Sequence, residues 1–240
     1  MIEKILPPAA ACAEAFADPP GIALFPEEEA LLAQAAAKRR REFTTARGCA
    51  RDALAALGVA PAPILPGERG APRWPPGVVG SITHCAGYRA AAVAHDRDLL
   101  TIGLDAEPDD MLPDGVLEII ALPAERARLR DLTAAAPDTR WDRLLFSAKE
   151  SVYKAWFPLT RRWLGFEDAD ITIHPAPGTS ADTDVPPPVT SADTGVPAHG
   201  TFEARLLVTA PAPAGAAPAG FTGRWLAADG LILTAIAVPA

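Results

Sequence analysis

The chain has little cysteine and no long hydrophobic run, and these two features argue against a disulfide-rich protein and a membrane-spanning protein. Its three cysteines, Cys12, Cys49 and Cys85, are odd in number and lack CxxC spacing, so we expect reduced thiols, not a disulfide framework or zinc site. No uninterrupted apolar run reaches about 18 residues, so no membrane-spanning helix is expected. The first residues lack a basic segment followed by an apolar core, so no signal peptide is expected. Together these features predict a cytoplasmic protein that has no membrane partner.

An excess of positive charge is also absent, since the formal net charge is −8 at pH 7. This charge argues against general nucleic-acid binding. Basic residues are nevertheless concentrated in one segment, where residues 38–41, Arg47 and Arg51 carry six positive charges against the single acid Glu42. Hydrophobic residues make up 49% of the 240 positions, which is enough for a packed core in one large domain or two small ones.

Hydrophobic periodicity predicts an α+β fold. Helices are expected over 26–58 and over 141–157, the second ended by Pro158, with short helices after Pro113. Strands are expected over 78–85, 88–95, 98–107, 168–175, 200–210 and 221–238, the last with a hairpin turn at 228–230. The order of these elements predicts two α+β halves of similar plan, an N-terminal half at 1–106 and a C-terminal half at 107–240.

Residues 175–200 form a low-complexity insertion in the second half. The octamers TSADTDVP and TSADTGVP repeat there almost verbatim, with few apolar side chains to bury. Such a composition predicts a disordered, mobile loop, and we assign it no chemistry.

Two acidic motifs carry the chemistry. GLDAEP at 103–108 places Asp105 and Glu107 on the same side of a strand end. FSAKESVYKAW at 146–156 places Glu150 and Lys154 one helical turn apart. Oxygen ligands of this kind suit Mg²⁺, whose remaining ligands are commonly phosphate oxygens. The alternative is a pair of solvated strand-end acids and an ordinary ion pair on a helix surface.

Phosphate recognition cannot rest on a glycine-rich loop here. The chain has neither a GxxxxGK[ST] motif nor a GxGxxG that follows a strand. Phosphate would therefore be bound by basic side chains and a metal, because arginine forks match phosphate oxygens in pairs. The candidates are Arg39, Arg40, Arg47, Arg69 and Lys154. Ser81 and His84 in GSITHC are not part of a GxSxG elbow, which argues against a hydrolase.

The two motifs together resemble the signature of the 4′-phosphopantetheinyl transferases, G-[IVL]-D-x-E followed by [FW]-[SCT]-x-K-E-[AS]-x-x-K. The interval from Asp105 to Glu150 is 45 residues, as that signature requires. KRRREFTTARGCARDAL at 38–54 and RRWLGFEDADITI at 161–173 extend the similarity over nearly the whole chain outside the insertion. The chain is similar to the Sfp-type enzymes, especially the actinobacterial subgroup related to enterobactin synthase component D.

The resemblance implies a fold of two pseudo-twofold-related halves, each a small, mainly antiparallel sheet packed with helices, with coenzyme A between them. It implies that the enzyme moves the 4′-phosphopantetheine arm of coenzyme A to a serine of an apo acyl, peptidyl or aryl carrier protein, releasing 3′,5′-adenosine bisphosphate. Mg²⁺, or Mn²⁺ in its place, would be required. Such enzymes serve polyketide, nonribosomal peptide and siderophore biosynthesis, and a monomer is expected.

The resemblance also assigns roles to residues. Asp105, Glu107 and Glu150 would hold the metal. Lys154 would steady the charge on the transferring or leaving phosphate, with Glu150, directly or through a water, as proton acceptor and Asp105 as the third catalytic residue. Coenzyme A would be bound by Arg39, Arg47, Arg69, Thr83, His84, Lys149 and Lys154. The chain departs from its subgroup at Pro66, where a lysine is common, which leaves that contact to Arg69.

Two other functions use the same acids. One is a different Mg²⁺-dependent phosphotransferase, such as a nucleotide hydrolase, which needs no macromolecular acceptor. The other is a non-catalytic carrier-binding module that keeps the fold. The presence of all three acids together with Lys154 favours the transferase.

Overall fold

The computed structural model describes residues 1–177, 198–212 and 215–240, so most of the predicted insertion, at 178–197, lies outside the described residues. The helices are α1 (Pro26–Ala30), α2 (Ala37–Ala56), α3 (Val116–Ile120), α4 (Pro123–Ala135) and α5 (Trp141–Thr160), with 3₁₀ turns at Ile2–Ile5, Glu68–Gly70 and Phe166–Asp168. The strands are β1 (Ala11–Ala15), β2 (Val78–Cys85), β3 (Tyr88–His95), β4 (Leu99–Pro108), β5 (Ala169–Pro175), β6 (Ala198–Leu206), β7 (Pro211–Ala212), β8 (Gly215–Ala216), β9 (Gly220–Ala228) and β10 (Leu231–Pro239).

The strands form two main antiparallel sheets, which confirms the α+β class. The smaller sheet has the order β1-β3-β2 and the larger the order β4-β10-β9-β6-β5, while β7 and β8 pair separately. Strand β4 directly follows the smaller sheet in the chain but pairs with β10 near the C-terminus, with Asp105 opposite Thr234. The predicted boundary after residue 106 therefore falls within β4, a strand that joins the first half to the sheet of the second.

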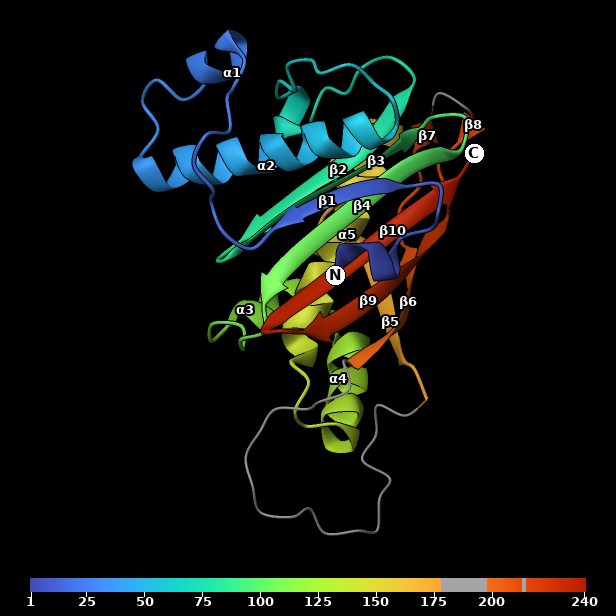
Figure 1. Ribbon diagram of the computed structural model, residues 1–240. Helices are drawn as coiled ribbons and strands as arrows, with labels where there is room; N and C mark the ends of the chain where they lie inside the picture. Colours follow the sequence, from blue (N-terminus) through green and yellow to red (C-terminus); the bar gives the residue numbers. More distant parts are fainter. Residues whose placement is uncertain (178–197, 213–214) are drawn as a thin grey trace.

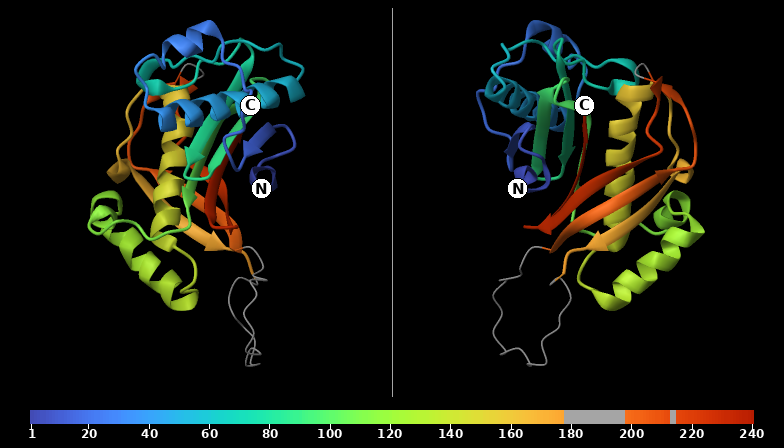
Figure 2. Two further views of the ribbon diagram at one scale, coloured as in Figure 1. Left: turned by 60° about the vertical axis from the view of Figure 1, so that its left-hand side comes forward. Right: turned by 90° about the vertical axis from the view of Figure 1, so that its right-hand side faces the viewer.

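The elements stack in four layers (Figures 1 and 2). Helix α2 packs on the outer face of the smaller sheet through Ala50, Ala53 and Leu54. The inner faces of the two sheets meet through small side chains of β3, including Ala92, and larger ones of β4 and β10, including Leu104. The largest apolar cluster lies between the larger sheet and helices α4 and α5. Residues 90–94 of β3 are buried on both faces, which explains the unbroken apolar run in the middle of this strand.

Most of the predicted elements are confirmed, and the differences concern the bounds of two helices and three short strands. The predicted helix over 26–58 is two helices, because residues 31–36 form turns and a short link between α1 and α2. Pro158 does not end α5, which continues to Thr160 and stops at Arg161, whose φ is +57°. Proline removes one helical hydrogen bond, a loss that the last turn tolerates because its other bonds remain. Strands β1, β7 and β8 were not predicted, since they are short and composed mainly of small residues.

The hairpin turns occur where the glycines predict them. Gly87 joins β2 to β3 with φ +76°, and Asp229 and Gly230 join β9 to β10 with φ of +52° and +74°. Two successive positive φ values give a type I′ turn, whose twist matches that of the paired strands. Within the described residues, none of the helices has both the length and the apolar character needed to cross a lipid bilayer.

Candidate active site

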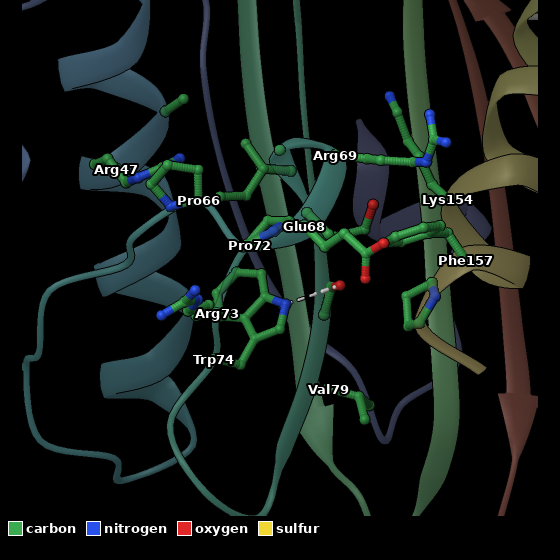
Figure 3. A pocket seen from close by; sticks show the side chains of 18 of the residues that line it. Arg47, Pro66, Glu68, Arg69, Pro72, Arg73, Trp74, Val79, Lys154 and Phe157 are labelled. Carbon is green, nitrogen blue, oxygen red and sulfur yellow. Dashed lines mark hydrogen bonds between the residues drawn. The ribbon is translucent and has the colours of Figure 1, made fainter. Parts of the chain in front are cut away.

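A cavity of about 1080 Å³ opens where both main sheets and their helices meet. It is bounded by α2, the loop at 66–74, β2, the start of β4 and the second half of α5 (Figure 3). The predicted site residues on its wall are Arg39, Arg47, Arg69, His84, Glu150 and Lys154. Figure 3 places Arg47 on one side of the cavity and Arg69 and Lys154 on the other. The fold thus gathers charged residues from segments far apart in the sequence.

Strand β4 presents alternate residues to α5, and a glycine lets the two elements approach closely. Thr101 Oγ1 donates a hydrogen bond to the carbonyl of Ala155 at 3.0 Å. Two residues further along β4, a Cβ at position 103 would lie 2.0 Å from the carbonyl oxygen of Ser151. This distance is far too short for any side chain, so the position requires glycine. Because side chains alternate along a strand, Asp105 then also faces α5. Gly103 is therefore what allows the acidic end of β4 to meet α5.

Asp105 is the most buried of the predicted acids, with 4% of its surface exposed. Its Oδ1 accepts a hydrogen bond from Lys154 Nζ at 2.7 Å, so the predicted meeting of an acid with this lysine is present. Its Oδ2 is buried and has no hydrogen-bond partner among the described residues. An unpaired buried carboxylate oxygen is costly, so this atom marks a place where a cation would be favourable.

The other two acids share this environment. Burial raises the pKa of Glu107 and of Glu150, and the charge of Asp105 raises both further. The guanidinium of Arg143 offsets part of this effect at Glu107, and Lys154 offsets part of it at Glu150. The charge of Asp105 thus disfavours the charged form of both glutamates, and a cation bound near it would relieve this effect.

Arg143 is a site residue that the motifs alone do not reveal. Its Nη1 donates to Glu107 Oε2 at 3.0 Å, while Nε and Nη2 donate to the carbonyls of Asp110 and Met111 at 2.9 and 2.8 Å. It therefore fixes both Glu107 and the turn that follows β4. Arg143 lies seven residues, or two helical turns, before Glu150, and this spacing on one helix face could have indicated it.

The donor chemistry of this region suits a hard divalent cation, because carboxylate oxygens are the ligands that Mg²⁺ prefers. The unpaired Asp105 Oδ2 fits that role. Among the described residues, however, no three acids, histidines or cysteines are already gathered in the geometry of a metal site. Lys154 holds one oxygen of Asp105 and Arg143 holds one oxygen of Glu107, so the metal ligation of these acids stays a prediction.

Arg39, Arg47 and His84 form what we call the basic wall of the cavity. Arg47 is the most buried of the three. Its Nε donates to the carbonyl of Ile64 at 2.8 Å, and its guanidinium lies 4.2 Å from the centre of the Phe43 ring. Burial lowers its pKa to about 10, which still leaves it fully charged at neutral pH. The terminal nitrogens have no hydrogen-bond partner within the described residues, so they are available to a ligand in the cavity.

Arg39 and His84 form a pair at the rim of the same wall. Arg39 Nη1 lies 3.1 Å from His84 Nε2. Partial burial and the neighbouring guanidinium lower the pKa of His84, so the ring is neutral at physiological pH and Nε2 accepts from Arg39. A neutral histidine here orients Arg39 and leaves its remaining N–H groups for an anion.

The loop at 66–74 forms a further part of the cavity wall. Trp74 Nε1 donates to the carbonyl of Gly80 at 3.0 Å, which fastens the loop to β2 (Figure 3). Pro66 pairs with Pro72 in an isolated bridge, so the position that often holds a lysine is part of the loop's own framework. Arg69 has φ +51° and lies over the ring of Trp163 at 5.3 Å. This contact joins the loop to the segment after α5.

Two predicted ligand residues lie elsewhere. Thr83 is buried on β2 and is not part of the cavity wall, although its neighbour His84 is. The prediction that Lys149 lies in the same pocket is wrong. Lys149 is 3% exposed and its Nζ binds Glu125 at 2.8 Å. One residue corresponds to about 100° around a helix, so Lys149 points away from the face that carries Glu150.

Comparison with known proteins places this geometry in a family. Residues 27–94 match the 4′-phosphopantetheinyl transferase N-terminal domain, and residues 101–199 match the 4′-phosphopantetheinyl transferase superfamily. The chain is 50% identical over its whole length to 4′-phosphopantetheinyl transferase Svp of Streptomyces mobaraensis, of which it covers 90%. The chain belongs to the 4′-phosphopantetheinyl transferase superfamily.

Other relatives support the same membership. The chain is 50% identical to 4′-phosphopantetheinyl transferase PptT of Mycobacterium tuberculosis, over 94% of this chain and 91% of that protein. It is 35% identical to enterobactin synthase component D of Salmonella typhi, over 59% of this chain and 58% of that protein. The family and the enzyme class predicted from the sequence are confirmed. In this phosphopantetheinyl transferase, the basic wall belongs to the segment that matches the N-terminal domain, residues 27–94. Asp105, Glu107 and Glu150 belong to the segment that matches the superfamily, residues 101–199.

Proposed function

We propose that this transferase moves the 4′-phosphopantetheine arm of coenzyme A to a serine of an apo carrier protein and releases 3′,5′-adenosine bisphosphate. The observation that carries the proposal is the division of one cavity into a basic wall and an acidic corner. Arg39 and Arg47 stand on the first, and Glu150 and Lys154 on the second, beside Asp105. A ligand with several phosphates and a reactive phosphoryl group needs both.

The size of the cavity supports a ligand as large as coenzyme A. Small-molecule sites typically enclose about 300–1,000 Å³. The cavity, at about 1080 Å³, lies just above that range. Its basic wall suits the phosphates at the nucleotide end, because guanidinium groups bind phosphate oxygens in pairs. The phosphopantetheine end would then lie toward α5.

We propose that Asp105, Glu107 and Glu150 hold Mg²⁺, which would neutralise charge on the phosphates when it is bound. Lys154 supplies a second positive charge at the same corner, 2.7 Å from Asp105. Transfer of a phosphoryl group depends mainly on such charge stabilisation and on alignment. Glu150, directly or through a water, takes the proton of the serine hydroxyl, since it lines the cavity beside Lys154.

The experiment is intact mass spectrometry of apo acyl, peptidyl and aryl carrier proteins after incubation with the transferase, coenzyme A and Mg²⁺. We expect a mass gain of one phosphopantetheine on the carrier serine and an equal amount of 3′,5′-adenosine bisphosphate. EDTA and the Glu150→Gln variant should each abolish the gain, and the exposed-site variant Glu27→Gln should retain it. Full transfer in EDTA would refute the metal assignment while leaving the transferase function intact.

Two outcomes would favour the alternative functions. Release of 3′,5′-adenosine bisphosphate at the same rate without any carrier would indicate a hydrolase or another phosphotransferase. Carrier binding without any mass gain, at saturating coenzyme A and Mg²⁺, would indicate a non-catalytic module.

A further inference from the structure

Glu28 is buried where its sequence context predicts exposure. It lies in α1 between Glu27 and Glu29, both of which are exposed. Glu28 itself has 0% of its surface exposed. Burying an ionised carboxylate is favourable only when hydrogen bonds and opposite charges replace its water. Glu28 must therefore have buried hydrogen-bond and charge partners, which its two exposed neighbours do not need.

The partners of Glu28 come from three separate segments. Its Oε2 accepts from the backbone N–H of Phe25 at 3.0 Å and from Arg51 Nη1 at 3.0 Å. Its Oε1 accepts from the backbone N–H of Ile64 at 2.9 Å. One side chain thus ties α1 to the middle of α2 and to the segment that leads into the loop at 66–74.

The tie to Ile64 leads to Arg47 on the cavity wall. The carbonyl of Ile64, the residue whose N–H Glu28 holds, accepts from Arg47 Nε at 2.8 Å. Glu28 Oε1 also lies 3.9 Å from that same Nε. With Phe43 against one face of the guanidinium, the inner edge of Arg47 is fixed from three directions. Its two terminal nitrogens are left for the cavity.

Electrostatics favour the same arrangement. Burial and the nearby guanidinium groups of Arg39 and Arg51 lower the pKa of Arg47, and the charge of Glu28 opposes them. Three arginines would otherwise repel one another across this wall. The segment after α1 also contributes Leu31 and Leu32 to the cavity wall, so the position of α1 shapes the cavity directly.

We propose that Glu28 is a positioning residue for coenzyme A binding, which holds Ile64 and Arg47 so that the Arg47 guanidinium presents its terminal nitrogens to a phosphate of the ligand. The inference rests on the proposed function, because it takes Arg47 as a phosphate ligand. Glu28 does not itself line the cavity, so its proposed effect on the phosphate passes through Arg47.

Glutamine at position 28 is the informative substitution. It keeps the size of the side chain but removes the charge and turns one acceptor oxygen into an amide donor. That donor would face either Ile64 N–H or the pair of donors from Phe25 and Arg51, which are hydrogen-bond donors themselves. The inner support of Arg47 is then lost, whereas Glu27→Gln makes the same chemical change at an exposed site and serves as the control.

The experiment is a double-mutant cycle on the full chain, read by calorimetric binding of coenzyme A and of 3′,5′-adenosine bisphosphate. We expect Glu28→Gln to weaken coenzyme A binding at least about tenfold, the loss typical of one hydrogen bond to a charged group. Turnover at saturating coenzyme A should stay within about twofold, and Glu27→Gln should bind like the parent. In an Arg47→Ala background, Glu28→Gln should cost less than about twofold more, because its effect passes through Arg47.

The outcomes separate the inference from the function on which it rests. Equal losses from Glu28→Gln with and without Arg47 would overturn the inference, as would parental affinity in folded Glu28→Gln. Failure of the parent protein to bind coenzyme A would overturn the proposed function instead. If thermal unfolding shows that Glu28→Gln does not fold, Glu28→Asp is taken through the same cycle under the same criteria, since it keeps the charge and shortens the reach by one methylene.

Discussion

Replacing Lys149 by methionine should lower stability and leave the ligand site unchanged. Lys149 Nζ binds Glu125 at 2.8 Å and the carbonyls of Phe166 and Ala169 at 2.6 and 3.0 Å, and both charged side chains are almost fully buried. Burial lowers the pKa of Lys149, and Glu125 opposes that shift. Methionine fills a similar volume but leaves Glu125 as a buried charge without its cation.

The magnitude follows from the kind of interaction that is broken. Removing one partner of a buried ion pair costs about 3–5 kcal/mol. For a chain of this size, each kcal/mol lowers Tm by about 2–4 °C, so Lys149→Met should lower Tm by about 6–20 °C. Glu125 keeps backbone donors at Leu122 and Ile171, both at 2.7 Å. The double variant Lys149→Met with Glu125→Gln should therefore recover part of the loss, because no unpaired charge stays buried.

The assay combines thermal unfolding with calorimetric binding of coenzyme A. Coenzyme A affinity of folded Lys149→Met should stay within about twofold of the parent, because Lys149 is not on the cavity wall. Lys38→Met, at an exposed lysine on α2, controls for the loss of a positive charge. An unchanged Tm together with coenzyme A binding weakened tenfold would refute the reasoning, since it would place Lys149 at the ligand and not between α4 and α5.

Three further changes test other parts of the site. Gly103→Ala should destabilise the fold by about 3 kcal/mol or more in chemical denaturation, because its Cβ would lie 2.0 Å from the carbonyl of Ser151; parental stability would contradict the close approach of β4 to α5. Lys154→Met should lower kcat far more than coenzyme A affinity, since its charge acts on the transition state, and a loss confined to affinity would make it only a ground-state anchor. The kcat/KM for the carrier, measured at saturating coenzyme A, should fall as salt rises from about 0.05 to 0.5 M, because the Debye length shrinks from ~14 to ~4 Å. The variant Arg162→Glu, at an exposed position, should raise the KM for the carrier. If neither the salt nor the variant changes these constants, the carrier docks through apolar contacts.

The sequence pattern predicted those elements whose structure depends on interactions between neighbouring residues. The strands at 78–85 and 88–95 occur with the predicted bounds, because the Ala86-Gly87 turn between two strand-forming segments specifies both strands and their register. The period of α5 places Glu150 and Lys154 on one face, and the period of β4 places Asp105 and Glu107 on one side. The family signature then relates the two elements, although they lie 45 residues apart in the chain.

The direction in which a buried charge points was decided by the tertiary structure. Helical periodicity separates Lys149 from Glu150 by about 100°, but it does not say which of the two faces the cavity. That choice depends on α4, which offers Glu125 to Lys149. Likewise, nothing in a run of three glutamates distinguishes Glu28, whose partner Ile64 lies 36 residues away.

The sequence by itself thus determined the class of the fold, the family and most of the charged residues around the cavity. It did so because period, turn chemistry and motif spacing are properties of neighbouring residues. The tertiary structure alone decided the pairing of β4 with β10, the contacts of Arg143 and Glu28, and the buried ion pair of Lys149 with Glu125. The three charged contacts depend on desolvation, and a charge is desolvated only when segments distant in the chain close around it.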